Sequence, residues 1–118
     1  MPLKVRSPKT IITVLVTEDS ETIAHALMLI LNSDPKVEVV GWAKNGEECL
    51  RMVAKLRPDI VTMDIEMPLL DGIETTRAIL KEHPVPILIV SSTIKGDLKK
   101  TFDALQAGAF DVIERPRL

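Results

Sequence analysis

The sequence predicts a single α/β domain in which helices cover both faces of a parallel β-sheet. Its 118 residues have the length of one ordinary domain. Short apolar runs alternate with amphipathic helical patterns along the chain, and this alternation is typical of parallel strands joined by right-handed helical crossovers. Hydrophobic residues make up 46% of the chain and charged residues 27%, so the chain can bury a core and is not expected to be disordered.

Five segments are expected to form the strands of this sheet. Residues 11–16, 60–63 and 87–90 are nearly continuous apolar runs rich in branched side chains, the pattern of strands that are buried on both faces. Residues 37–43 predict a strand nearer to an edge, because a glutamate interrupts their apolar character. Residues 112–113 predict a short last strand.

Four amphipathic patterns predict one helix in each connection between strands. The first carries an apolar stripe at helical spacing from Ile23 to Leu31. The other three begin at residues whose side chains can accept a hydrogen bond from the first helical turn, namely Asn45, Asp71 and Asp97. We expect these three helices to end near positions 56, 82 and 108.

The chain is expected to hold one domain and a tail. Residues 1–10 contain two prolines and three basic side chains without any periodicity, which predicts an N-terminal tail. The domain itself is expected to span residues 11–118, because no internal repeat or linker divides that region.

The composition argues against several classes of function. The net charge is −2, whereas nucleic-acid-binding domains usually carry a basic excess, so neither DNA nor RNA is an expected partner. The single cysteine, Cys49, cannot form an internal disulfide, which fits a reducing compartment. No apolar run approaches the roughly 18 residues of a membrane span, and the N-terminus lacks the apolar stretch of a signal peptide. We therefore expect a cytoplasmic protein that is not associated with a membrane.

Polar residues stand where the predicted strands end. Glu18 and Asp19 follow the first strand, Asp64 closes the third, Ser91 closes the fourth and Arg115 follows the fifth. Ligands of open parallel sheets bind beyond the carboxyl ends of the strands. Three carboxylates that converge there would repel one another unless a cation lay between them, and Mg²⁺ is the natural occupant. Spacing alone leaves open the alternative that these acids are merely solvated.

Beside such a cation, a carboxylate can act as a nucleophile toward a phosphoryl group. A hydroxyl and a fixed positive charge can then bind the phosphoryl oxygens. Ser91 and Arg115 are residues of the right types for these two tasks.

Three segments resemble the signature segments of response-regulator receiver domains: Val-Thr-Glu-Asp-Ser at 16–20, Met-Asp-Ile-Glu-Met-Pro-Leu-Leu-Asp-Gly at 63–72 and Val-Ser-Ser at 90–92. The likeness covers roughly residues 11–117. Within the family, Asp-Ile-Glu-Met-Pro, Val-Ser-Ser and the Asn-Gly-Glu-Glu stretch at 45–48 are most similar to the receiver of the chemotaxis protein-glutamate methylesterase. The resemblance implies a flavodoxin-like three-layer sandwich with a five-stranded parallel sheet in the order 2-1-3-4-5.

The resemblance also implies roles for the strand-end residues. Asp64 would accept a phosphoryl group from a phosphohistidine of a sensor histidine kinase. Mg²⁺ would be bound directly by Asp19 and Asp64, by the backbone carbonyl of Glu66, and by Glu18 mainly through water. Ser91 would be the hydroxyl that moves toward the phosphoryl group. Trp42 is not expected beside the metal.

The sequence departs from the family pattern at four places, of which Glu18 in place of the more usual aspartate is the mildest. Arg115 stands where the family has lysine, and a planar guanidinium is not equivalent to a compact ammonium. Val112 stands where many relatives carry an aromatic switch residue. The sequence also stops at Leu118, where related receivers continue into a fifth helix, so we expect the fifth helix to be missing.

Two functions are therefore expected as alternatives. The first is a phosphorelay receiver that regulates an attached methylesterase domain or a partner protein. No Gly-x-Ser-x-Gly nucleophile motif occurs in this sequence, so the methylesterase catalytic domain is not part of it. The second is a degenerate or stand-alone receiver that acts only as a protein-interaction module, with Arg115 marking the loss of control by phosphorylation.

Overall fold

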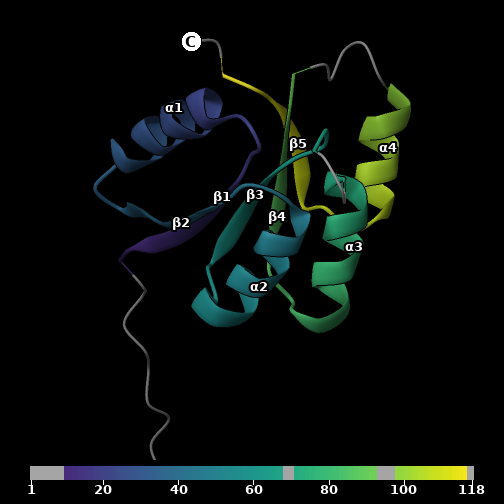
Figure 1. Ribbon diagram of the computed structural model, residues 1–118, viewed down its shortest axis with the longest axis horizontal. Coiled ribbons are helices and arrows are strands. Elements are labelled where there is room, and N and C mark those ends of the chain that lie inside the picture. The colour runs from purple at the N-terminus through teal and green to yellow at the C-terminus, as the bar shows by residue number, and fades with distance from the viewer. Residues whose placement is uncertain (1–9, 68–70, 93–97, 117–118) are drawn as a thin grey trace, which may run out of the picture.

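Strands and helices alternate from Ile12 to Glu114, as the sequence predicts (Figure 1). The structure is a computed structural model that describes residues 10–67, 71–92 and 98–116. The elements are β1 (Ile12–Thr17), α1 (Glu21–Asn32), β2 (Val37–Ala43), α2 (Gly46–Leu56), β3 (Ile60–Asp64), α3 (Gly72–Glu82), β4 (Ile87–Ser91), α4 (Leu98–Gln106) and β5 (Asp111–Glu114).

The five strands form one parallel sheet in the order β2-β1-β3-β4-β5. The register aligns the ends of the strands, since Thr17 pairs with Met63, and Ser91 pairs with Glu114. The residues that follow β1, β3, β4 and β5 therefore meet at one edge of the sheet. Both the expected fold class and the expected strand order are confirmed.

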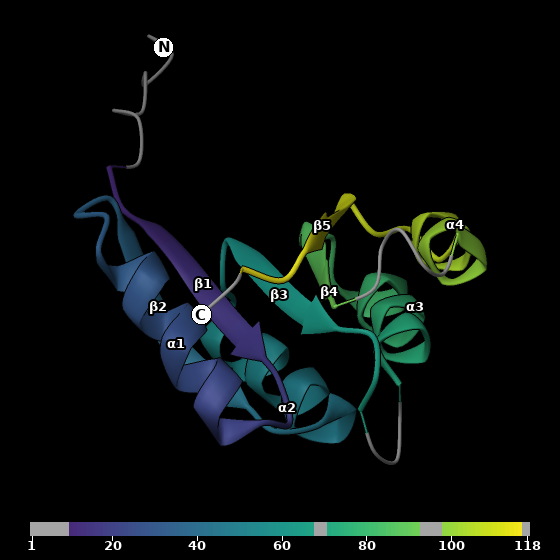
Figure 2. The ribbon, with the colours of Figure 1, turned by 90° about the horizontal axis from the view of Figure 1, so that it is seen from above.

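Helices pack on both faces of the sheet (Figures 1 and 2). Residues of α2, α3 and α4 join one core cluster with side chains of β1, β3 and β4, among them Leu15, Met63 and Ile89. α1 packs through Leu27 against Val14 and Val16 in a second, smaller cluster. Within the described parts of the chain, the face that α1 covers carries no second helix, as the sequence predicts.

The predicted helix caps that lie among the described residues are present. The side chain of Asn45 accepts a hydrogen bond from the amide of Glu48 (2.9 Å), and that of Asp71 accepts one from the amide of Glu74 (2.8 Å). Gly108 follows α4 with a φ of 107°, a conformation that favours glycine after a helix. The third expected cap, at position 97, lies outside the described residues, as does the tail over 1–9.

Several large apolar side chains remain exposed on α4 and just after it. Leu98 and Phe102 are 77% and 59% exposed, and Phe110, before β5, is 74% exposed. The apolar stripe that the sequence predicts on this helix therefore faces largely outward. None of the described helices combines the length and the apolar character that a bilayer span requires.

Candidate functional site

The strand-end residues line a cavity of about 180 Å³ at the carboxyl edge of the sheet. Parallel strands bring their carboxyl ends to the same edge, which is why residues so far apart in sequence meet there. The polar residues of its wall include Glu18, Asp19, Asp64, Glu66, Ser92 and Arg115.

Three carboxylates converge in this cavity. One carboxylate oxygen from each of Glu18, Asp19 and Asp64 lies within 4.8 Å of the other two. Glu18 and Asp64 are only 1% and 6% exposed, whereas Asp19 is exposed. Two of the three acids are therefore withdrawn from water, and the third faces solvent at the mouth of the cavity.

Arg115 pairs with two of these acids. Its Nη2 lies 3.0 Å from Oε1 of Glu18 and 3.5 Å from Oδ2 of Asp64. Its backbone amide donates to the carbonyl of Ser91 (2.8 Å), which extends the pairing of β4 and β5 by one residue and fixes where the side chain starts. The sequence predicts that this residue lies in the site, and the structure brings it into contact with two of the acids.

Burial and crowding change the acidity of the two buried carboxyls. Burial is the main cause that raises the pKa of Glu18, from 4.5 to about 7, and the neighbouring Asp19 and Asp64 raise it further. Burial also raises the pKa of Asp64, although hydrogen bonds and Arg115 act in the opposite direction. One guanidinium thus does not compensate the negative charge of this cavity.

The donor set fits a hard divalent cation. The cluster offers carboxylate oxygens, the ligand type that Mg²⁺ prefers, and one side that is open to water. A divalent charge between the acids would stabilise their ionised forms, which burial disfavours.

The loop after β1 is fixed by hydrogen bonds from three directions. The amide of Ser20 donates to Oε2 of Glu18 (3.0 Å), and the amide of Glu18 donates to the carbonyl of Ala43 (3.0 Å). The indole Nε1 of Trp42 donates to the carbonyl of Glu18 (2.7 Å). Trp42 therefore touches the backbone of the acidic loop, although it is not among the described residues that line the cavity. The signal available in the sequence was its place at the end of the strand beside β1.

The loop after β3 brings a backbone donor and a glycine to the site. The amide of Glu66 donates to Oδ1 of Asp64 (3.2 Å), while the Glu66 side chain points to Lys100 (2.8 Å). A Cβ atom on Gly72 would lie 2.1 Å from the carbonyl oxygen of Asp64. Only glycine fits there, so α3 can begin directly against the end of β3.

Two serines follow the core of β4. Ser91 is the last residue of the strand and is mostly buried. Ser92 is exposed and lines the cavity. The sequence predicts Ser91 as the hydroxyl of the site, and Ser92, the second serine of the same Val-Ser-Ser segment, is the one that lines the cavity.

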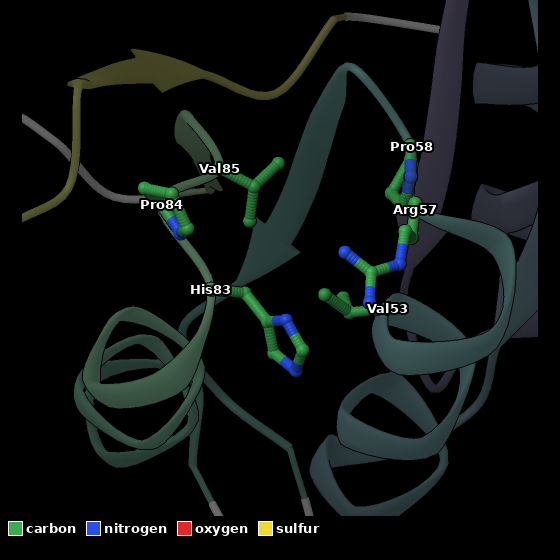
Figure 3. Close-up of a pocket in the computed structure, with 6 residues that line it drawn as sticks. All are labelled: Val53, Arg57, Pro58, His83, Pro84 and Val85. Carbon is green, nitrogen blue, oxygen red and sulfur yellow. The ribbon is translucent and has the colours of Figure 1, made fainter.

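A second cavity, of about 150 Å³, lies at the opposite edge of the sheet (Figure 3). Its wall includes Arg57 and His83, which follow the C-termini of α2 and α3. The helix dipole is negative at a C-terminus, which favours the positive charge of Arg57 after α2. None of the described residues that line this cavity is a carboxylate, so they do not offer the oxygen ligands that Mg²⁺ prefers.

Comparisons with known proteins agree on one family. A family model described as "Response regulator receiver domain" matches residues 14–117. A protein-glutamate methylesterase/protein-glutamine glutaminase of Syntrophus aciditrophicus is 50% identical over 108 residues, which are 91% of this chain and 31% of that protein. One of Halalkalibacterium halodurans is 46% identical over 89% of this chain and 30% of that protein. The chain thus spans about three-tenths of the length of these relatives.

Solved structures agree with this result. The response regulator domain of Thermotoga maritima CheB has a TM-score of 0.85 and 42% identity, over 91% of this chain and 80% of that one. The CheX-CheY-BeF3-Mg complex of Borrelia burgdorferi has a TM-score of 0.79 and 28% identity, with the same coverage of both chains.

Proposed function

Because this chain belongs to the response regulator receiver domain family, we propose that it accepts a phosphoryl group on Asp64 in a reaction that depends on Mg²⁺. The chain is similar in particular to the regulatory domain of the chemotaxis methylesterase. The observation that carries the proposal is the cluster of three carboxylates, two of them buried, at the carboxyl edge of the sheet.

Asp64 is the proposed nucleophile because of its place and its contacts. It closes the central strand β3 and faces the cavity, with Oδ1 held by the amide of Glu66 and Oδ2 near Arg115. A carboxylate oxygen of Asp64 would bond to the phosphorus of a phosphohistidine. The P–N bond would break, and its electron pair would remain on the departing imidazole.

Four residues are proposed to hold the metal: Asp19 and Asp64 directly, Glu66 through its backbone carbonyl, and Glu18 mainly through water. When bound, Mg²⁺ supplies positive charge that attracts the phosphoryl oxygens and offsets the charge of the acids. The structure of the Borrelia burgdorferi relative is a complex with BeF3 and Mg. This supports the proposal that Mg²⁺ and a phosphoryl group occupy the corresponding site of this chain.

Ser91 and Arg115 are proposed to bind the phosphoryl group after transfer. The Ser91 hydroxyl would donate to a phosphoryl oxygen, and its movement would change the segment that follows β4. Arg115 already reaches Glu18 and lies near Asp64, so its guanidinium can supply the fixed positive charge at this edge.

The proposed partners are a sensor histidine kinase, as phosphoryl donor, and a domain or protein that reads the phosphorylated state. The similar methylesterases are about three times as long as the match, so an attached methylesterase domain is the proposed target. We also propose a cytoplasmic location, with neither nucleic acid nor a membrane as partner.

A second candidate function follows from Arg115. Its Nη2 lies 3.0 Å from Oε1 of Glu18 and 3.5 Å from Oδ2 of Asp64, and a guanidinium that pairs with both acids suits an interaction module that is not switched by phosphorylation. The exposed apolar side chains of α4 would then serve as a constant binding surface.

Phosphorylation of the purified chain by acetyl phosphate and Mg²⁺ tests the first function. We expect the mass of one added phosphoryl group on the wild type and none on Asp64→Asn. The matched control is Asp34→Asn, an exposed carboxylate in the turn after α1, which should be labelled like the wild type. Beryllofluoride with Mg²⁺ should shift amide resonances at the ends of β3 and β4, whereas a module of the second kind would show neither labelling nor shifts.

A further inference from the structure

We propose that Trp42 is a positioning residue for the cation site, and that its indole N–H holds the peptide group that carries Asp19. The indole Nε1 donates a hydrogen bond of 2.7 Å to the carbonyl oxygen of Glu18. The amide on the other side of Glu18 donates to the carbonyl of Ala43 (3.0 Å). Two consecutive residues of β2 thus bind both peptide groups of Glu18.

The carbonyl that Trp42 binds belongs to the peptide unit between Glu18 and Asp19. A peptide unit is planar, so the direction of this oxygen fixes the plane in which the nitrogen and Cα of Asp19 lie. Asp19 is exposed and close to two other carboxylates, so repulsion favours its rotation outward. The indole therefore fixes the backbone from which this side chain extends and opposes a backbone movement that would take the carboxylate away from the other two.

The indole ring is itself held in place on several sides. His25 of α1 meets it edge-on, with 5.6 Å between ring centroids and an angle of 66°. The Nζ atom of Lys44 lies 5.3 Å from the ring centroid, within the range of a cation–π contact. The ring also packs against the cluster formed by Val14, Val16 and Leu27. These contacts aim the N–H at a fixed point, which a flexible side chain could not do.

Packing alone does not account for the choice of tryptophan. A phenylalanine would keep an aromatic ring against the same cluster, but it has no N–H to donate. The inference rests on the proposed Mg²⁺ site and adds to it a residue outside the set of proposed ligands. Groups that orient metal ligands commonly affect the affinity of a metal site, even without touching the metal.

Trp42→Phe tests the inference through Mg²⁺ binding, followed by the amide resonances of Asp19 and Asp64. We expect Mg²⁺ affinity to fall by about three-fold to ten-fold, the range that corresponds to the net contribution of one hydrogen bond. Val39→Ala is the matched control, because Val39 lies on the same strand and packs against the same cluster but does not touch Glu18. This control should lose stability and keep the wild-type affinity.

The wild type gives a second readout that needs no variant. The chain has one tryptophan, so its spectrum contains one indole N–H resonance. This resonance should shift along the same Mg²⁺ titration curve as the amide of Asp19, because Glu18 joins the two groups.

Each outcome bears on a defined claim. Equal Mg²⁺ affinity in Trp42→Phe and the wild type overturns the inference, and so does an equal loss of affinity in Val39→Ala. If Trp42→Phe does not fold, an indole resonance that stays still while the Asp19 amide shifts overturns it. The absence of any Mg²⁺-dependent shift at Asp19 and Asp64 in the wild type refutes the proposed metal site instead.

Discussion

The buried carboxyl of Glu18 predicts that the metal-free domain loses stability as the pH rises from about 4.5 to about 7. Folding places Glu18 where it is 1% exposed and raises its pKa from 4.5 to about 7. Between these values the folded chain binds a proton that the unfolded chain releases, so the folded state is favoured at the lower pH. The contribution of Glu18 to the free energy of unfolding is fully present below about pH 4.5 and is lost as the pH rises through about 7.

The size of this loss follows from the pKa values. A pKa raised from 4.5 to about 7 corresponds to about 3 kcal/mol of unfolding free energy, which is a large share of the stability of a small domain. The pKa of Asp64 is also raised in the folded chain, so this residue adds to the loss of stability at higher pH. Glu18→Gln should remove most of the pH dependence, because glutamine does not ionise and its carbonyl oxygen can still accept from Arg115.

Urea unfolding in the presence of a chelator, between about pH 5 and about pH 8, measures this effect directly. The exposed Glu38 provides the control, and Glu38→Gln should keep the pH dependence of the wild type. Mg²⁺ should restore stability to the wild type at the higher pH, because it binds the ionised acids of the folded state only. The reasoning is refuted if wild type and Glu18→Gln lose stability in parallel, or if the wild type gains stability as the pH rises.

Three further substitutions have defined outcomes. Asp64→Asn should raise the free energy of unfolding, measured with a chelator at neutral pH, by about 1 kcal/mol, because it removes a buried charge from a cluster of like charges. A urea midpoint lower than that of the wild type would contradict this. Arg115→Lys should enlarge the beryllofluoride-induced amide shifts in β5, because a compact ammonium can lie between Asp64 and a phosphoryl oxygen; unchanged shifts would mean that arginine already does this. Gly72→Ala should cost about 1–3 kcal/mol, as its Cβ would meet the carbonyl of Asp64 at 2.1 Å, and wild-type stability would exclude this close contact.

The sequence predicts the fold well because the features that determine it are local. Alternating apolar runs and helical stripes fix the order of the elements, and side chains such as Asn45 and Asp71 mark where helices begin. The same local reasoning brings Glu18, Asp64 and Arg115 to one edge, because every parallel strand ends there. No knowledge of side-chain conformation is needed for these steps.

Contacts across the sheet are harder to predict, since they depend on which side chain reaches which neighbour. The periodicity of α4 predicts an apolar face but not that Leu98 and Phe102 remain exposed on it. The residue after a strand is predictable, yet whether Ser91 or Ser92 lines the cavity depends on how the chain turns after β4. These features are set by tertiary packing, which periodicity does not record.

The contact between Trp42 and Glu18 depends on an irregularity that no sequence pattern shows. In the pairing of β1 with β2, Val14 lies opposite Val39, but Leu15 lies opposite Gly41, so one residue of β2 is extra. Such a bulge reverses the faces to which later side chains point. A Cβ on Gly41 would accordingly meet Met52 of α2, whereas Trp42 packs with Val39 in the cluster under α1. If β2 paired with β1 without a bulge, regular alternation along residues 39–42 would turn the indole toward α2, away from the side on which it reaches the carbonyl of Glu18.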